Sequence, residues 1–179
     1  MIEYIKSDLI RYYGKNDLFT FFVGYLKNRA FRFQVAFRLC QGKGIVKFIG
    51  LFLWFINRSK NFIQLPRQTK VGYGLYIGHD GPITVNPTAV IGNNVNISQY
   101  TTIGSNEGKA AVIGDNTYIG PSVCIVENVK IGNNVTIGAG SVVTKDIPDN
   151  ATAVGNYAKV INYKDPGRFV TKRYKIKEN

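Results

Sequence analysis

The second half of the chain repeats a six-residue pattern, in which one aliphatic residue precedes small or polar ones. The aliphatic position is always Ile or Val, and Gly follows it in six of nine repeats. A period of six matches neither the turn of an α-helix nor the two-residue alternation of a strand in a β-meander. It predicts a parallel β-solenoid, in which each hexapeptide forms one short strand and one corner. The nine aliphatic positions are Ile91, Ile97, Ile103, Ile113, Ile119, Ile125, Ile131, Ile137 and Val143.

Two irregular steps interrupt the repeat. The ten-residue step from Ile103 to Ile113 predicts an insertion, and the eight-residue step from Ile77 to Val85 predicts a two-residue bulge at residues 79–82. We therefore expect a mainly β fold whose solenoid domain spans residues 66–161. Weaker repeats extend it upstream through Val71, Ile77 and Ile83, and its end is marked by Ile147, Pro148 and Gly155.

Residues 1–65 have a different pattern and form an expected N-terminal helical segment. Apolar residues recur at helical spacing over 17–42, and a second apolar stretch covers 44–57, so we expect two or three helices. The second stretch is shorter than the roughly twenty residues that cross a bilayer. Two interpretations stay open: residues 17–60 contact a membrane surface, or the helices form a cap on the solenoid or in an oligomer.

Charge is concentrated at the two ends of the chain. Residues 1–60 contain eleven Lys and Arg against three Asp and Glu, whereas residues 61–160 contain six of each. Residues 162–179 form a basic tail that we expect to wrap back over the last coil and then fray. Basic ends suit a membrane surface, an anionic substrate or nucleic acid. No recognised nucleic-acid-binding motif accompanies the charge, so we do not expect that partner.

Few residues are available for metal or disulfide chemistry. The chain has two cysteines far apart and a single histidine, which excludes a disulfide framework and a His-rich zinc site, so no metal is expected. Residues 1–8 lack the pattern of a signal peptide, so we expect a cytoplasmic protein, with a peripheral position on the inner membrane face if the helices contact lipid.

The segment from Val71 to Ile161 resembles the hexapeptide-repeat acyltransferases, and within them the serine acetyltransferase-like branch. The resemblance implies a left-handed β-helix, a homotrimer, and acetyl-CoA lying in grooves between subunits. It covers about half of the chain, and Tyr157 stands where the closing motif usually has Pro. The motifs are Ile77-Gly78-His79, Ile91 to Val95, Ile113 to Asn116, Ile137 to Val143, Lys145 to Pro148 and Val154 to Val160.

O-acylation requires a base that takes the proton of an acceptor hydroxyl. His79 matches the catalytic histidine of the family, and its usual pKa near 6.5 suits that task. The family orients this histidine with an aspartate fifteen residues upstream, a position that is Gln64 here. Asp80 is adjacent, but strand alternation would direct it away, so the orienting group stays open between them.

Other positions match the family's acyl-CoA contacts. Backbone N–H groups near Gly104 and Ser105 are expected to stabilise the thioester oxyanion. Lys145 and Lys159 lie where the family contacts the CoA phosphates. The pantetheine arm is expected to pass the small residues Gly120, Gly138 and Ala139, although tight corners would explain these residues equally well.

The acceptor is less directly indicated. The family's second histidine, the arginine before it, and the aspartate preceding the catalytic histidine are Ala110, Lys109 and Gly78 here. These losses and the basic ends predict, as the acceptor, a sugar hydroxyl of a small-molecule or lipid-linked glycan precursor, as in the similar acetyltransferases of bacterial polysaccharide assembly. The alternatives are a serine O-acetyltransferase of cysteine biosynthesis and a non-catalytic trimeric scaffold.

Overall fold

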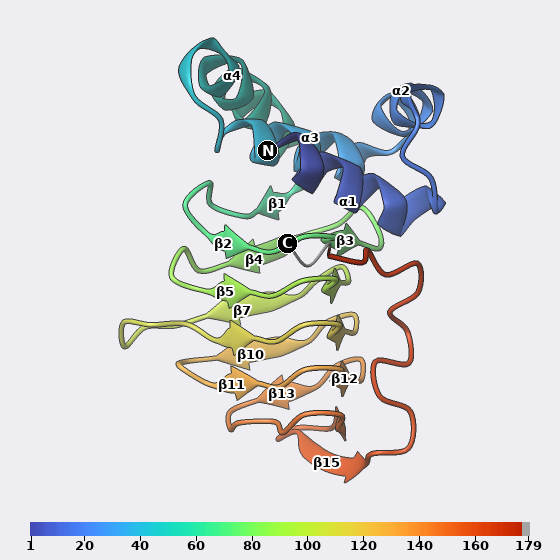
Figure 1. Cartoon of the computed structure of the whole chain (residues 1–179). Helices are drawn as coiled ribbons and strands as arrows, with labels where there is room; N and C mark the ends of the chain where they lie inside the picture. Colours follow the sequence, from blue (N-terminus) through green and yellow to red (C-terminus); the bar gives the residue numbers. More distant parts are fainter. Residues whose placement is uncertain (177–179) are drawn as a thin grey trace.

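A three-sided parallel β-solenoid forms most of the molecule (Figure 1). The computed structural model describes residues 1–176. The first sheet contains β1 (Ile63–Gln64), β4 (Ile83–Val85), β7 (Thr102–Gly104), β10 (Cys124–Val126) and β13 (Val142–Val143). The second contains β2 (Lys70–Val71), β5 (Val90–Ile91), β8 (Val112–Ile113) and β11 (Lys130–Ile131). The third contains β3 (Tyr76–Ile77), β6 (Asn96–Ile97), β9 (Tyr118–Ile119), β12 (Thr136–Ile137), β14 (Thr152–Val154) and β15 (Lys159–Asn162). The expected β-helix is therefore confirmed.

The register of the strands accounts for both irregular steps of the sequence. Ile125 pairs with Val143, eighteen residues later, which is one regular coil of three hexapeptides. Ile63 pairs with Ile83, a separation of twenty, so the coil containing His79 carries two extra residues. Ile103 pairs with Ile125, a separation of twenty-two, which reflects the insertion after β7.

The core is a stack of the repeated aliphatic side chains. Each is almost fully buried and lies on its equivalent in the next coil, as Ile97 lies on Ile119. The corners between the second and third sheets turn at Asn94, Asn116 and Asn134, each with φ of 55°. Asn tolerates this left-handed conformation better than most residues do, which explains its recurrence there.

Four helices precede and cover the solenoid: α1 (Ile2–Tyr13), α2 (Leu18–Lys27), α3 (Arg29–Leu39) and α4 (Gly44–Asn61). Asp17 and Asn28 begin α2 and α3 by accepting hydrogen bonds from backbone N–H groups of the first turn. The expectation of two or three helices was wrong, because α1 is an additional one. The first strand begins at Ile63, so the solenoid also starts slightly earlier than expected.

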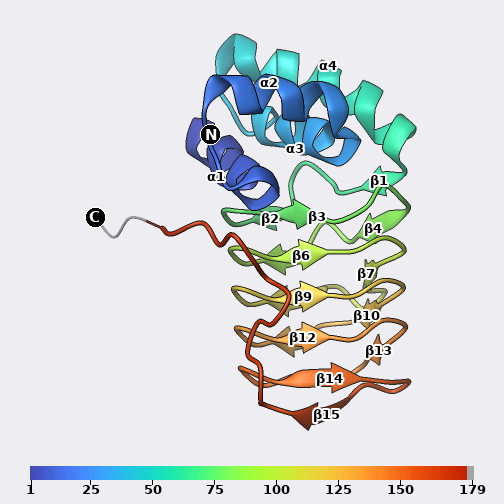
Figure 2. The ribbon, with the colours of Figure 1, turned by 90° about the vertical axis from the view of Figure 1, so that its right-hand side faces the viewer.

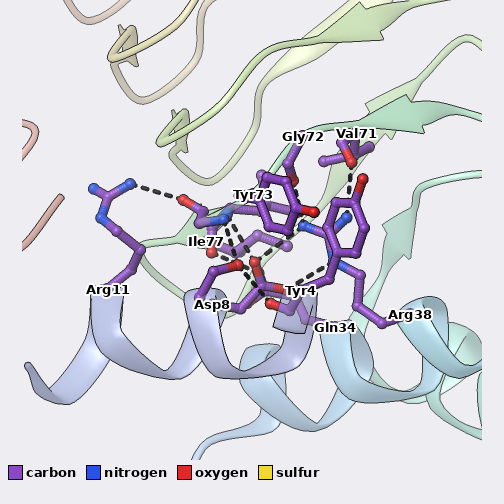
Figure 3. A network of polar contacts seen from close by, with 12 residues as sticks. Tyr4, Asp8, Arg11, Gln34, Arg38, Val71, Gly72, Tyr73 and Ile77 are labelled. Atoms are coloured by element: carbon purple, nitrogen blue, oxygen red, sulfur yellow. Dashed lines mark hydrogen bonds and ion pairs between the residues drawn. The ribbon is translucent and has the colours of Figure 1, made fainter. Parts of the chain in front are cut away.

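Polar side chains of α1 and α3 bind the backbone at the N-terminal edge of the first coil and so cover it (Figure 3). Arg38 forms a buried ion pair with Asp8, with N–O distances of 2.9 and 3.0 Å. Arg38 also donates to the carbonyl oxygens of Val71 and Gly72, and Asp8 accepts the N–H of Leu75. An uncovered strand edge exposes unpaired backbone groups, so these contacts act as the cap that a repeat protein requires.

The C-terminal segment does more than cover the last coil. Strand β15 pairs antiparallel with β14, and residues 163–176 then return along the solenoid to α1 (Figure 2). Asn96 donates to the carbonyl of Phe169, and Tyr174 donates its hydroxyl to Glu3. The expected tail is thus an ordered strap. The expectation that the tail frays is wrong for its described part, and residues 177–179 lie outside the described residues.

Candidate active site

His79 lies in the bulge between β3 and β4, with its side chain exposed. Two hollows meet at this residue. One, of about 330 Å³, is bounded by the bulge and by Lys27, Asn28 and Arg29 at the α2–α3 junction. The other, of about 130 Å³, is lined by polar and aromatic side chains of the third sheet, among them Ser98 and Tyr118. The bulge therefore presents the imidazole to a space that can hold a small substrate.

The helical cap positions the strand that leads to His79. The hydroxyl of Tyr12 accepts the N–H of Ile77 at 3.1 Å and donates to the amide oxygen of Gln34. Gln34 in turn donates to the carbonyl of Leu75 at 2.8 Å. Burial raises the pKa of the Tyr12 phenol well above its usual value, so this hydroxyl stays protonated. The sequence did not predict this role for Tyr12 and Gln34, because nothing in their spacing distinguishes them from other helix residues.

The orienting partner of His79 is not defined by a hydrogen bond. Gln64 lies on the first sheet and lines a separate hollow of about 650 Å³ with Trp54, Arg58 and other residues. Within residues 1–176 no hydrogen bond joins Gln64 to His79. Asp80 borders the same hollow as His79 and is also exposed.

Three of the expected acyl-CoA residues follow the same solenoid edge as His79. Gly120 and Gly138 directly follow β9 and β12, as Gly78 follows β3, and Ala139 occupies the position equivalent to His79. Because coils are spaced by about 4.8 Å, Ala139 lies roughly 14 Å from His79 along the axis. A Cβ on Gly120 would lie 2.9 Å from the backbone nitrogen of Ala139, so the close stacking of coils itself requires glycine there.

Gly104 and Ser105 lie on a different edge, where the insertion leaves β7. The carboxylate of Glu127 holds this insertion by accepting hydrogen bonds from the Ser105 hydroxyl at 2.7 Å and from the N–H groups of Asn106 and Glu107. The bond from Ser105, together with the backbone donors, lowers the pKa of Glu127 below its usual range. Glu127 was not expected from the sequence. The equivalent positions of the neighbouring coils are Ser105 and Lys145, so the repeat itself gave no signal for this carboxylate.

The two expected phosphate-binding lysines are exposed near the far end of the solenoid. Lys145 follows β13 on the insertion edge, and Lys159 lies in β15 opposite Val154. Neither makes a side-chain ion pair within the described residues. Among residues 1–176, no cluster of three or more His, Cys, Asp or Glu side chains could hold a metal ion.

The three positions that differ from the family pattern have different environments. Ala110 is buried, and its N–H donates to the hydroxyl of Thr88 at 2.9 Å. Lys109 is exposed in the insertion. Gly78 has open space around it, because an added Cβ would make only an ordinary contact of 3.5 Å with Tyr76.

Comparison with known proteins agrees with this architecture. The family described as bacterial transferase hexapeptide (six repeats) matches residues 110–145. Serine acetyltransferase 3, mitochondrial, of Arabidopsis thaliana is 43% identical, over 92% of this chain and 44% of its own length. The chain therefore spans less than half of that relative.

Solved structures extend the similarity. Soybean serine acetyltransferase complexed with serine is 30% identical, covers 88% of this chain and 68% of its own, and superimposes with a TM-score of 0.71. The Neisseria gonorrhoeae enzyme in complex with serine is likewise 30% identical, with coverages of 87% and 67% and a TM-score of 0.71. The six-residue repeat and the three-sided solenoid define a hexapeptide-repeat β-helix. The chain belongs to the hexapeptide-repeat acyltransferase family, and its homologues are serine acetyltransferases.

The expectation of a glycan acceptor was wrong, since the relatives are serine acetyltransferases. Part of the basic charge that motivated it has a structural role. Arg11 donates to the carbonyl of Gly74, and Arg38 is buried in the cap. In the tail, Lys172 donates to the carbonyl of Tyr12, and Arg173 to that of Gly167. These side chains stabilise the fold and are not free to recognise a glycan.

Proposed function

We propose that the chain is an acetyl-CoA-dependent serine O-acetyltransferase. The observation that carries this proposal is the similarity to serine acetyltransferases across about nine tenths of the chain, including two structures with serine bound. In the reaction, the hydroxyl oxygen of L-serine bonds to the thioester carbonyl carbon. The carbon–sulfur bond breaks, and CoA leaves as the thiol with the proton removed from serine.

His79 is the general base of this proposal. It is exposed beside two hollows, where its imidazole can take the hydroxyl proton as the oxygen attacks. Asp80 borders the larger of these hollows, whereas Gln64 lines a different one, which favours Asp80 over Gln64 as the group that orients the imidazole.

The acyl donor would require residues of two solenoid edges. Gly120, Gly138 and Ala139 lie along the His79 edge, where the pantetheine arm would pass. Gly104 and Ser105 lie on another edge, together with Lys145, while Lys159 lies in β15. A homotrimer would bring the His79 edge of one copy against the insertion edge of the next and so complete the acetyl-CoA groove. Light scattering coupled to size exclusion tests this assembly, with a mass of three chains of 20.0 kDa expected.

The activity is tested by release of thiol from acetyl-CoA in the presence of L-serine. His79→Gln should lower kcat about 10²- to 10⁴-fold, because proton transfer from the hydroxyl loses its acceptor. Asp165→Asn, an exposed change in the tail, is the matched control and should retain full activity.

Two outcomes would contradict the proposal. Thiol release without any dependence on L-serine would exclude serine as the acceptor. Absence of both release and CoA binding would support the alternative of a non-catalytic scaffold.

A further inference from the structure

Helices α2 and α4 expose unusually many large apolar side chains. The exposed fractions are 60–78% on α2 and 50–72% on α4. Isolated exposed apolar residues are common, but contiguous sets mark interaction surfaces. We call this set the apolar end face. It consists of Leu18, Phe19, Phe22 and Leu26 on α2, and Ile45, Phe48, Ile49, Phe52 and Phe55 on α4.

The apolar residues of α4 form one stripe opposite its contact with the rest of the protein. Ile45, Phe48, Ile49 and Phe52 recur at the three- and four-residue spacing that places side chains on one helix face. On the other side Gly50 is buried against α3, where an added Cβ would overlap the backbone of Leu39. The stripe therefore faces away from α3 and contributes nothing to the monomer's core.

The two helices lie so that one flat surface can contact both. They occupy the end of the molecule farthest from β15, on either side of α3 (Figure 1). Both run across the solenoid axis at the same level (Figure 2). On α2, Gly24 is buried against Tyr13 and Phe31, so the apolar residues on the other side of this helix face away from them. The solenoid extends away from the helices (Figure 2).

The charge around the apolar end face is almost entirely positive. Between residues 15 and 60 there are nine Lys and Arg and a single acidic residue, Asp17. One of the nine, Arg38, is buried in its ion pair with Asp8, which leaves eight. Of these, Lys47 and Arg58 border the α4 stripe on one side and Lys60 on the other, as helical spacing places them, and all three are exposed. Long basic side chains can lay their apolar stems along such a surface and extend their charges toward anionic groups.

We propose that the apolar end face docks α2 and α4 into the interface of an anionic phospholipid membrane. Apolar stripes flanked by Lys and Arg, on helices lying in one plane, are the features of interfacial helices. A second copy of this chain suits the surface less well, because like charges would then face each other. None of the helices described is long and apolar enough to cross a membrane, so the contact is peripheral. This inference does not depend on the proposed acetyltransferase activity.

Flotation with vesicles tests the proposal. The full chain should float with vesicles of phosphatidylcholine and phosphatidylglycerol at low salt, and less at high salt. It should bind far less to phosphatidylcholine alone. Phe48→Ser combined with Phe52→Ser should lower the partition coefficient at least about tenfold, because two large apolar side chains are lost from the interface.

The matched control is Ile161→Ser combined with Tyr163→Ser, which removes two exposed apolar residues at the opposite end of the molecule. It should float as the unchanged protein does. Fluorescence of the single Trp54 and circular dichroism verify that each variant is folded. Failure to float with anionic vesicles, or flotation unaffected by the Phe substitutions, would overturn the proposal. The proposal would also be overturned if the Phe substitutions changed the molecular mass in solution without changing flotation. That result would identify the apolar end face as an interface between copies of the chain.

Discussion

Gly78, the residue before His79, is the family difference that can be reversed most simply. Its backbone accepts a side chain without overlap, so Gly78→Asp should fold normally and place a carboxylate beside the proposed base. A charge-assisted bond to the serine ammonium group is worth about 1.5–3 kcal/mol. We therefore expect a KM for L-serine lowered about tenfold or more, measured by thiol release at saturating acetyl-CoA.

Gly78→Asn is the control for this substitution, because it adds nearly the same volume without the charge. It should leave the KM for L-serine close to that of the unchanged protein. An equal decrease with Asn would show that polarity or volume is responsible, and the ion-pair explanation would then be wrong.

At the residue scale, the bulge at residues 79–82 was accessible to sequence reasoning because it interrupts the repeat, whereas the role of His79 was predicted from its match to the family's catalytic histidine. The structure places it in that bulge. The prediction that Gln64 orients His79 rests only on counting fifteen residues back from the histidine. The bulge and the separate sheets place Gln64 and His79 in different hollows, which a linear count does not reveal.

The insertion after β7 depends on the charge of Glu127. Hydrogen bonds hold the pKa of this carboxyl below its usual value of 4.5, so the ionised form is the one that binds the insertion. This contribution is fully present above pH 4.5 and is lost as the pH falls through the lower pKa of the folded state. We expect the amides of Asn106 and Glu107 to lose protection from hydrogen exchange in that acidic window, after correction for intrinsic rates.

Glu127→Gln should loosen the insertion at neutral pH, because an amide offers a single acceptor oxygen where the carboxylate offers two. Exchange at Asn106 and Glu107 should become roughly severalfold faster. Glu107→Gln, an exposed change in the same insertion, is the control and should leave protection unchanged. Equal protection in the Glu127 variant would contradict the assigned role.

The cap of α1 and α3 is expected to contribute a large share of stability through the Asp8–Arg38 pair. Asp8→Ala would leave the buried guanidinium of Arg38 without its partner, which costs about 3–5 kcal/mol in the free energy of unfolding. Urea unfolding measures this change. Lys6→Ala, which breaks an exposed pair with Glu3, should cost less than about 1 kcal/mol. Similar losses in both variants would contradict the argument.

At the element scale, the strands were predictable because every coil repeats the same buried aliphatic position. Helix α1 was not, because its inward face carries Ser7, Asp8 and Arg11 where an amphipathic helix would have apolar residues. Those side chains bind backbone groups of the solenoid edge. Such a role depends on the partner surface, which hydrophobic periodicity does not describe.

At the scale of the whole molecule, net charge was a poor guide to the acceptor. A formal charge of +12 does not distinguish cations that bind ligands from those that bind the protein's own carbonyl groups. Arg11 and Arg38 belong to the second class, and the structure was needed to reveal it. The apolar stretch 44–57 indicated an apolar helix at this end of the chain. Only the packing of α4 against α3 shows which side of that helix is exposed.

The returning tail changes how this repeat protein is expected to unfold. Coils of a solenoid contact only their neighbours, so its two ends can melt independently. Here Gly167 binds the carbonyl of Asn134, while Tyr174 binds Glu3, which ties a late coil directly to the first helix. Such a tie makes melting cooperative over the whole length. Trp54 fluorescence and far-ultraviolet circular dichroism should therefore report one melting transition. Deletion of residues 163–179 should separate the transitions that the two signals report. A single transition in both proteins would mean that the coils alone transmit cooperativity.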